Sequence, residues 1–160
     1  MEERTTVGAR QHAQYVFKEQ ECATVRSLAS AIEHVERVRG VSIDTQPLAA
    51  LDRTSVCGLL LVGASRCVIF HAVASSPLHR LQCILHELGH LLLEHDRHGR
   101  SADRLDRFLP GVELEAGDRI FGRDNLLERD EVDAELLADL LAAGIRRRPH
   151  QQTCLEEFFG

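Results

Sequence analysis

The sequence contains no tryptophan, and aromatic residues as a whole make up only 4% of it. Proteins that bind single-stranded nucleic acid stack bases on aromatic side chains, so this class is not expected. Lysine is almost absent as well, since Lys18 is the only one and the other basic residues are arginines. The formal net charge is −6, which makes an electrostatically driven contact with DNA or RNA unfavourable. We therefore expect no direct nucleic-acid partner.

Long apolar runs and paired cysteines are also missing. The longest apolar runs, such as residues 58–63, fall far short of the roughly 20 residues that a membrane-spanning helix needs. The five cysteines are odd in number, widely spaced and without a Cys-x-x-Cys pair, which is typical of reduced thiols and not of a disulfide framework. The polar N-terminus is unlike a signal peptide. These features predict a cytoplasmic protein with no membrane partner.

The hydrophobic pattern predicts alternating blocks of helix and strand. Hydrophobic residues make up 44% of the 160 residues, enough for one domain with its own core. Apolar positions recur at helical spacing over residues 23–39 and 126–143, and each stretch is followed by a glycine, Gly40 or Gly144, as an expected stop. Residues 41–44 alternate like a short strand. Two apolar runs, residues 55–63 and 67–72, are predicted to form a β-hairpin.

A third helix is predicted to begin at Pro77, because Ser76 can cap it and proline suits a first helical turn. It continues to about residue 94. The polar residues 95–123 are predicted as a long connection that includes one short helix over 102–108. This order of elements predicts an α+β fold. The expected organisation is an N-terminal arm or short helix (1–22), a domain (23–145) and a C-terminal tail (146–160).

The residues that carry chemistry are His86-Glu-Leu-Gly-His90, in the helix predicted from Pro77. On a helix, His86 and His90 lie one turn apart on one face, so both imidazoles can reach a single ion. Glu87 lies about 100° around the helix from His86, which places its carboxylate beside the ion and not on it. Zinc-dependent hydrolysis needs two neutral nitrogen ligands and a neighbouring base. The motif therefore predicts Zn²⁺ on His86 and His90, with Glu87 as general base.

A catalytic zinc site needs a third protein ligand. Position 96 is Asp and position 93 is Leu, so the His and Gly of the longer metzincin pattern are missing. Asp96 remains open as an alternative ligand. The favoured third ligand is Glu131, on the last predicted helix. Glu135 lies one turn later on the same face and is expected to accept the other ring N–H of a ligand histidine.

Other histidines and cysteines near the motif receive structural interpretations. His95 and His98 are expected to be exposed at the end of the helix, where an assisting role in catalysis is the less favoured alternative. Cys83 shares a helical face with His86 and His90, and a free cysteine on such a face is usually part of the core. None of these residues is included in the predicted site.

His86-Glu-Leu-Gly-His90 followed by Glu131-x-Asp-Ala-Glu135-x-Leu-Ala138 resembles the ImmA/IrrE family of metallo-endopeptidases. The similarity extends to the strand pair and to the polar lead into the motif, over about residues 23–145. Glu135 replaces a common Asn, and the insert between the two motifs is longer than in the family. The resemblance implies a zincin-like fold. In it, a small mixed or antiparallel sheet packs on the helix that carries the motif, and a later helix carries the third ligand.

The family resemblance also implies a function. It implies a cytoplasmic zinc endopeptidase that regulates transcription by cleaving a helix-turn-helix repressor, so that the repressor and not this chain contacts DNA. In this hypothesis His86, His90 and Glu131 bind zinc, and Glu87 is the general base and later the proton donor. The alternative is a non-catalytic zinc-containing regulator that binds a repressor or a toxin–antitoxin partner. Glu87 favours the enzyme, because a binding module has no use for an acid between the ligands.

Overall fold

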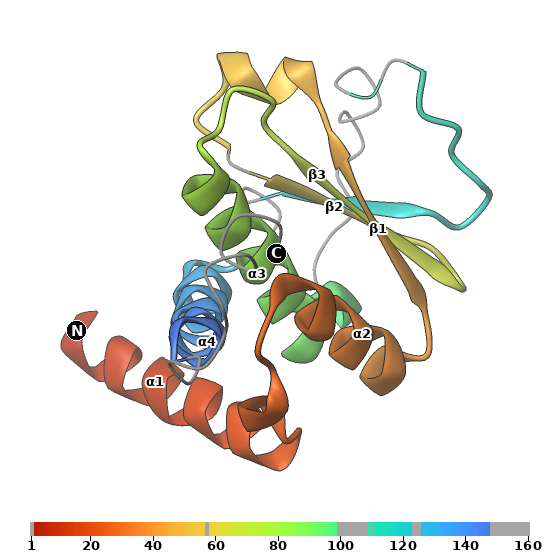
Figure 1. The fold of residues 1–160 in the computed structure, drawn as a ribbon. Coiled ribbons are helices and arrows are strands. Elements are labelled where there is room, and N and C mark those ends of the chain that lie inside the picture. The colour runs from red at the N-terminus through yellow and green to blue at the C-terminus, as the bar shows by residue number, and fades with distance from the viewer. Residues whose placement is uncertain (1, 57, 99–108, 110, 123–125, 148–160) are drawn as a thin grey trace, which may run out of the picture.

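The structure is a computed structural model that describes residues 2–56, 58–98, 109, 111–122 and 126–147. This part of the chain is an α+β fold, as predicted, with four α-helices and one four-stranded sheet (Figure 1). The helices are α1 (Glu2–Glu19), α2 (Leu28–Arg39), α3 (Pro77–Leu92) and α4 (Glu128–Arg146). The strands are β1 (Ser42–Pro47), β2 (Gly58–Val62), β3 (Arg66–His71) and β4 (Arg119–Phe121). Three short 3-10 turns join them, η1 (Cys22–Thr24), η2 (Ala49–Arg53) and η3 (His95–Arg97).

The sheet is mixed, with the strand order β1-β3-β2-β4. β2 and β3 form the predicted antiparallel hairpin, in which Leu60 pairs with Ile69. β1 pairs with β3 in parallel, and β4 pairs with β2 antiparallel, with Leu60 opposite Phe121. The sequence did not reveal β4, since residues 95–123 were expected to be a connection. A strand of three residues is too short to show a periodic pattern.

Both faces of the sheet are buried along β2 and β3, whose side chains alternate between them, whereas β1 is largely exposed. Leu60, Ile69 and Phe121 belong to the core that the helices complete. Leu61 and Phe70, on the other face, belong to a second apolar cluster. That cluster includes Leu51 of η2 and Leu109. The sheet therefore separates a helical side from a side covered by turns and connecting chain.

The helices stack in layers on one face of the sheet (Figure 1). α3 packs on β2 and β3, α4 packs on α3, and α1 packs on the other side of α4. The segment 1–22, expected to be an arm or a short helix, thus contains the 18-residue helix α1. Ala13 and Val16 of α1 are buried in the same core as the helices that follow. α4 is consequently covered on both sides and buries much of its surface.

Local signals account for where α2 and α3 begin. α2 starts at Leu28 and not at residue 23, because Ser27 and Ser30 form a capping box. It ends at Gly40 as predicted, with the glycine in the left-handed region (φ 66°). α3 begins as predicted at Pro77, where the Ser76 hydroxyl accepts the backbone N–H of His79.

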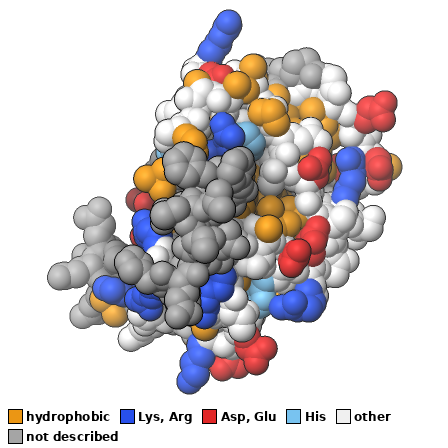
Figure 2. Space-filling view, viewed as in Figure 1, with side chains coloured by type: hydrophobic (Ala, Val, Ile, Leu, Met, Phe, Trp, Pro, Cys, Tyr) orange, Lys and Arg blue, Asp and Glu red, His pale blue; other side chains and the backbone are white. Residues whose placement is uncertain are grey.

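The predicted end of the last helix is wrong, because α4 continues through Gly144 to Arg146. A Cβ atom at Gly144 would lie 3.3 Å from the carbonyl oxygen of Val25, so this glycine permits a close approach between segments instead of ending the helix. The helix predicted over 102–108 lies outside the described residues. No helix of the described part is long and apolar enough to cross a bilayer. On the face seen in Figure 2, acidic and basic side chains are interspersed.

Candidate metal centre

The site is built where α3 and α4 approach each other at Gly89. A Cβ atom at this position would lie 2.9 Å from the backbone carbonyl oxygen of Ala134, a separation that real Cβ atoms essentially never show. Glycine is therefore what allows the two helix backbones to come this close. Gly89 lies between the two motif histidines, and Ala134 follows Glu131 by three residues. The contact thus brings the first turn of α4 beside the motif.

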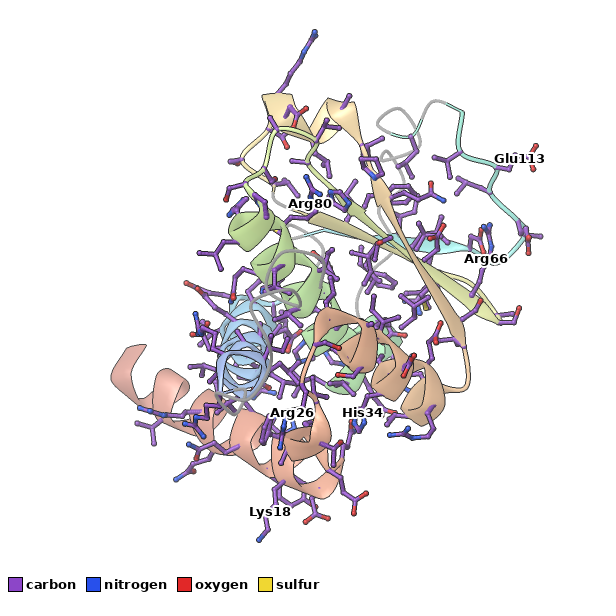
Figure 3. All side chains as sticks on the ribbon, viewed as in Figure 1. Lys18, Arg26, His34, Arg66, Arg80 and Glu113 are labelled. Carbon is purple, nitrogen blue, oxygen red and sulfur yellow. The ribbon has the colours of Figure 1, made fainter. Side chains whose placement is uncertain are left out.

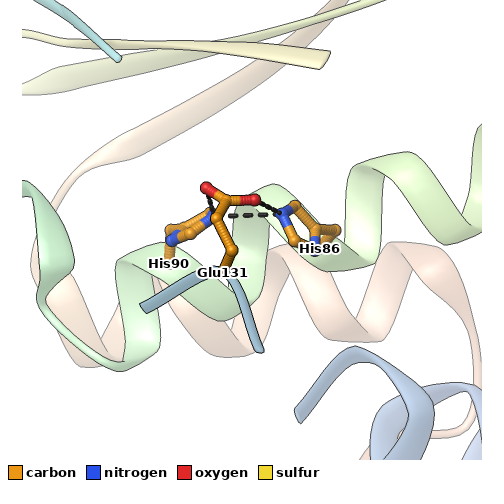
Figure 4. A group of neighbouring side chains, drawn as sticks. All are labelled: His86, His90 and Glu131. Carbon is orange, nitrogen blue, oxygen red and sulfur yellow. Dashed lines mark hydrogen bonds and ion pairs between the residues drawn. The ribbon is translucent and has the colours of Figure 1, made fainter. Parts of the chain in front are cut away.

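His86, His90 and Glu131 converge at this contact (Figure 4). His86 Nε2 lies 3.0 Å from His90 Nε2 and 3.1 Å from Glu131 Oε2. His90 Nε2 lies 3.3 Å from Glu131 Oε1. Tetrahedral zinc, with ligands at about 2.0–2.1 Å, separates those ligands by roughly 3.3 Å. The three predicted ligands therefore form a group that can hold a metal ion.

The electrostatics keep this group in the form that metal binding needs. Burial by itself would raise the pKa of Glu131, but hydrogen bonds to His86 and His90 outweigh burial and lower that pKa to about 2. Glu131 also lies in the first turn of α4, where the positive end of the helix dipole favours the ionised carboxylate. Burial also lowers the pKa of His90 below its ordinary value, despite the nearby carboxylate. An ionised Glu131 and a neutral His90 are metal-binding forms.

A pocket with a volume of about 260 Å³ opens beside the three converging residues, which line it. Glu87 lines this pocket as well. Glu87 is only 6% exposed. A Cβ atom at Gly58 would lie 2.7 Å from Glu87 Oε1, so the glycine at the start of β2 leaves the space that this carboxylate occupies. Sequence reasoning missed Gly58. The available signal was the glycine itself, because a glycine in a strand often marks a place where another group approaches the backbone closely.

The two remaining acidic candidates have different surroundings. Glu135 is exposed and lines the same pocket. The outer ring nitrogen of His90 faces His95 and not Glu135, at 2.9 Å from His95 Nδ1. Asp96 lies outside the ligand group and forms a two-pronged ion pair with Arg39, at 2.9 Å and 2.8 Å. The role expected of Glu135 stays a prediction, and the structure uses Asp96 elsewhere.

The expectation that His95 is exposed is wrong, because this residue is only 2% exposed. Glu94 adopts a left-handed conformation (φ 57°) after α3, and the chain folds His95 back against His90. The side chain of His98, by contrast, is 53% exposed. Cys83 is buried as expected, with its sulfur 3.5 Å from His79 Nε2.

Sequence reasoning also missed two buried acids on α4, Asp130 and Asp133, each 3% exposed. They flank Glu131 and approach His95. The available signal was the helical spacing between these acids and the apolar residues of α4. Asp133, for example, precedes the buried Leu137 by one helical turn and so lies on the apolar face of the helix. An acid on an apolar stripe needs a partner. The direct partners here are His98 for Asp130, at 3.0 Å, and His12 for Asp133, at 2.5 Å.

Comparisons of this chain with models of known families, with curated proteins and with solved structures find no match. The family resemblance therefore depends on the two motifs themselves. These motifs are the segments that α3 and α4 bring together around His86, His90 and Glu131.

Proposed function

We propose that this protein is a zinc-dependent endopeptidase of the gluzincin kind. The observation that carries the proposal is the convergence of His86, His90 and Glu131 in a pocket that Glu87 also lines. Two imidazoles and one carboxylate are a ligand set used in catalytic zinc sites, which keep a further position open for substrate or water. The pocket beside the three residues provides that open side.

Zinc held by these residues would supply a Lewis acid that polarises a peptide carbonyl and makes water more acidic. Glu87 would accept the proton of the water that attacks the scissile carbonyl. As the C–N bond breaks, Glu87 would return that proton to the leaving nitrogen. Its carboxylate is buried beside Gly58, in the lining of the same pocket as the ligand group. Glu131 contacts both imidazoles and would balance part of the positive charge of the zinc ion.

A protein substrate is proposed because of the family resemblance and the form of the pocket. The pocket has an apolar part formed by Val56, Phe121 and Leu126, which suits side chains of an extended segment. The substrate class proposed is a regulatory protein such as a helix-turn-helix repressor. A net charge of −6 is consistent with a chain that leaves DNA contact to its partner.

The first test is the metal content of purified wild type, His90→Ala and Glu131→Ala after equal exposure to zinc. We expect about one zinc per wild-type chain and loss of zinc in both variants, because each removes one of only three protein ligands. Glu128→Gln is the matched control, since Glu128 lies in the same first turn of α4 but outside the group. A wild type that holds no zinc would refute the proposed function.

The second test separates the enzyme from a non-catalytic regulator. Glu87→Gln is expected to keep zinc and to lose about 10²–10⁴-fold in cleavage of a candidate repressor, since it removes only the proton acceptor. Cleavage can be followed by mass spectrometry of the repressor fragments. If Glu87→Gln relieves repression as well as wild type does and no fragments form, the protein acts as a binding regulator.

A further inference from the structure

His95 is a buried residue that contacts His90 on the ring nitrogen facing away from His86 and Glu131. It opens η3, directly after the left-handed Glu94, and its Nδ1 lies 2.9 Å from His90 Nδ1. The side chains of His90 and His95 are each only 3% exposed. This is a direct contact between two buried imidazoles, and their proton positions depend on each other.

A hydrogen bond between two imidazole nitrogens requires one N–H and one bare nitrogen. His90 directs Nε2 toward His86 and Glu131. Without metal this nitrogen can donate a proton to Glu131, whereas metal binding requires a bare Nε2, with the proton of the neutral ring on Nδ1. His90 Nδ1 is then the donor, and His95 Nδ1 must be the bare acceptor. If His95 Nδ1 donated this hydrogen bond instead, the proton of the neutral His90 ring would be on Nε2, and Nε2 could not bind a metal ion.

Two buried carboxylates face the other nitrogen of His95. Its Nε2 lies 3.6 Å from Asp130 Oδ1 and 3.8 Å from Asp133 Oδ2, and both acids are nearly fully buried. These distances are too long for direct hydrogen bonds, but the negative charges favour a proton on Nε2. Each acid also has a closer histidine, His98 Nε2 at 3.0 Å from Asp130 Oδ2 and His12 Nδ1 at 2.5 Å from Asp133 Oδ2. Among the described atoms, Asp133 Oδ1 is buried without a hydrogen-bond partner.

The backbone around His95 is held independently of the ligand group. Arg39 of α2 binds both carboxylate oxygens of Asp96, the residue after His95, and also bonds to the carbonyl of Leu91. Arg119 of β4 donates to the backbone carbonyl of Asp96 at 2.8 Å. Two elements distant in sequence, α2 and β4, thus hold the backbone beside His95 in place.

We propose that His95 is a positioning residue that keeps His90 in the tautomer with its proton on Nδ1 and its Nε2 free for a metal ion. Asp130 and Asp133 keep His95 itself in the Nε2–H tautomer. This inference depends on the metal site of the proposed function and adds a requirement to it. The metal affinity is set partly by a residue that does not touch the metal.

The test is the zinc affinity of the full-length chain, measured by competition with a chromophoric chelator, for wild type and variants at position 95. His95→Leu removes the acceptor and is expected to weaken zinc binding about 10- to 100-fold. His95→Asn places a carbonyl oxygen at the level of Nδ1 and is expected to restore wild-type affinity. His95→Gln places its amide at the level of Nε2, beyond reach of His90, and is expected to behave like His95→Leu.

His34→Leu is the matched control, because His34 on α2 (Figure 3) is a buried histidine outside the ligand group that contacts Cys22 and Arg37. Its zinc affinity is expected to equal that of wild type. Equal affinities in wild type, His95→Leu and His95→Gln would overturn the role of His95 while leaving the metal site intact. No zinc binding by wild type would instead refute the proposed function and this inference together.

A measurement on the unaltered protein keeps the proposal falsifiable if the variants do not fold. The ¹⁵N resonances of the histidine rings in the zinc-loaded chain report which nitrogen carries each proton. We expect a protonated Nδ1 on His90, and a bare Nδ1 with a protonated Nε2 on His95. A proton on His95 Nδ1 would overturn the proposal.

Discussion

The two faces of the sheet bury different kinds of side chain. The face away from the helices buries an apolar cluster in which Leu61 and Phe70 pack against Leu51 and Leu109. On the helical side, the apolar core lies beside buried histidines and acids. These are His34, His71, Glu87, His90, His95, Asp96, Asp130 and Asp133. Burial of ionisable groups is costly unless they are paired, and they are concentrated on the side that carries the candidate metal centre.

The far face of the sheet thus contributes apolar burial without candidate ligands, whereas the helical side combines apolar burial with them. Apolar burial on the far face is expected to stabilise the fold without any role in metal binding. On the helical side, polar contacts fix the positions of the candidate ligands. Replacing a whole buried ion pair there by apolar residues is expected to change stability little or in either direction, whereas removing one partner alone is expected to be costly. Variants on each face can test this division, from the largest expected effect to the smallest.

Asp96→Asn is expected to have the largest effect on stability, because it leaves the guanidinium of Arg39 buried without its charged partner. Breaking a buried ion pair costs about 3–5 kcal/mol, and the side chains of Arg39 and Asp96 are 11% and 5% exposed. Urea unfolding measures the change, and Asp44→Asn, an exposed acid on β1, is expected to stay within about 0.5 kcal/mol of wild type. The variant should still bind one zinc at saturation. Complete loss of zinc would identify Asp96 as a ligand.

Leu61→Ala is expected to destabilise the protein by about 2–5 kcal/mol, since it opens a cavity in the apolar cluster of the far face. Leu61 is fully buried there. At a temperature where the variant remains folded, its zinc affinity should match that of wild type. Calorimetric unfolding and chelator competition measure the two quantities. A parallel loss of zinc affinity would contradict the division between the faces.

Gly89→Ala is expected to lower stability by about 1–3 kcal/mol, because the added methyl group meets the Ala134 carbonyl and pushes α3 and α4 apart. Zinc affinity should fall as well, since Glu131 moves with α4. Gly8→Ala is the matched control. Gly8 is also inside a helix, but a Cβ there meets nothing within 4 Å, so the change should stabilise the protein by up to about 1 kcal/mol. A stabilising effect of both variants would refute the close contact.

The last expected effect is on the acid dependence of the metal-free protein. The pKa of Glu131 is about 2 in the folded chain and ordinarily 4.5, so its ionised form stabilises the fold above about pH 5. This contribution is lost as the pH falls toward 2. Glu131→Gln should therefore be less stable than wild type at pH 6, and the difference in stability should shrink near pH 2. Thermal unfolding across this range measures the difference, and parallel curves would contradict the lowered pKa.

Much of the architecture follows from local signals. Ser76 and Pro77 predict the start of α3, and the apolar runs around residue 65 predict the hairpin of β2 and β3. β4 escaped prediction because three residues show no periodicity, and its strand pairing with β2 is a long-range contact. Gly144 was misread as a helix stop because a glycine at a helix end and one at a close backbone contact look alike in sequence.

The sequence by itself determined the metal-ligand candidates, because the helical period places His86 and His90 on one face whatever packs against them. It also supplied Glu131 as a candidate, through its spacing with Glu135. Only the tertiary structure decided that Glu131 meets the histidines, since that depends on the contact of Gly89 with Ala134. Likewise, the pairing of His95 with His90 depends on the left-handed Glu94 and on Arg39, contacts that no local pattern specifies.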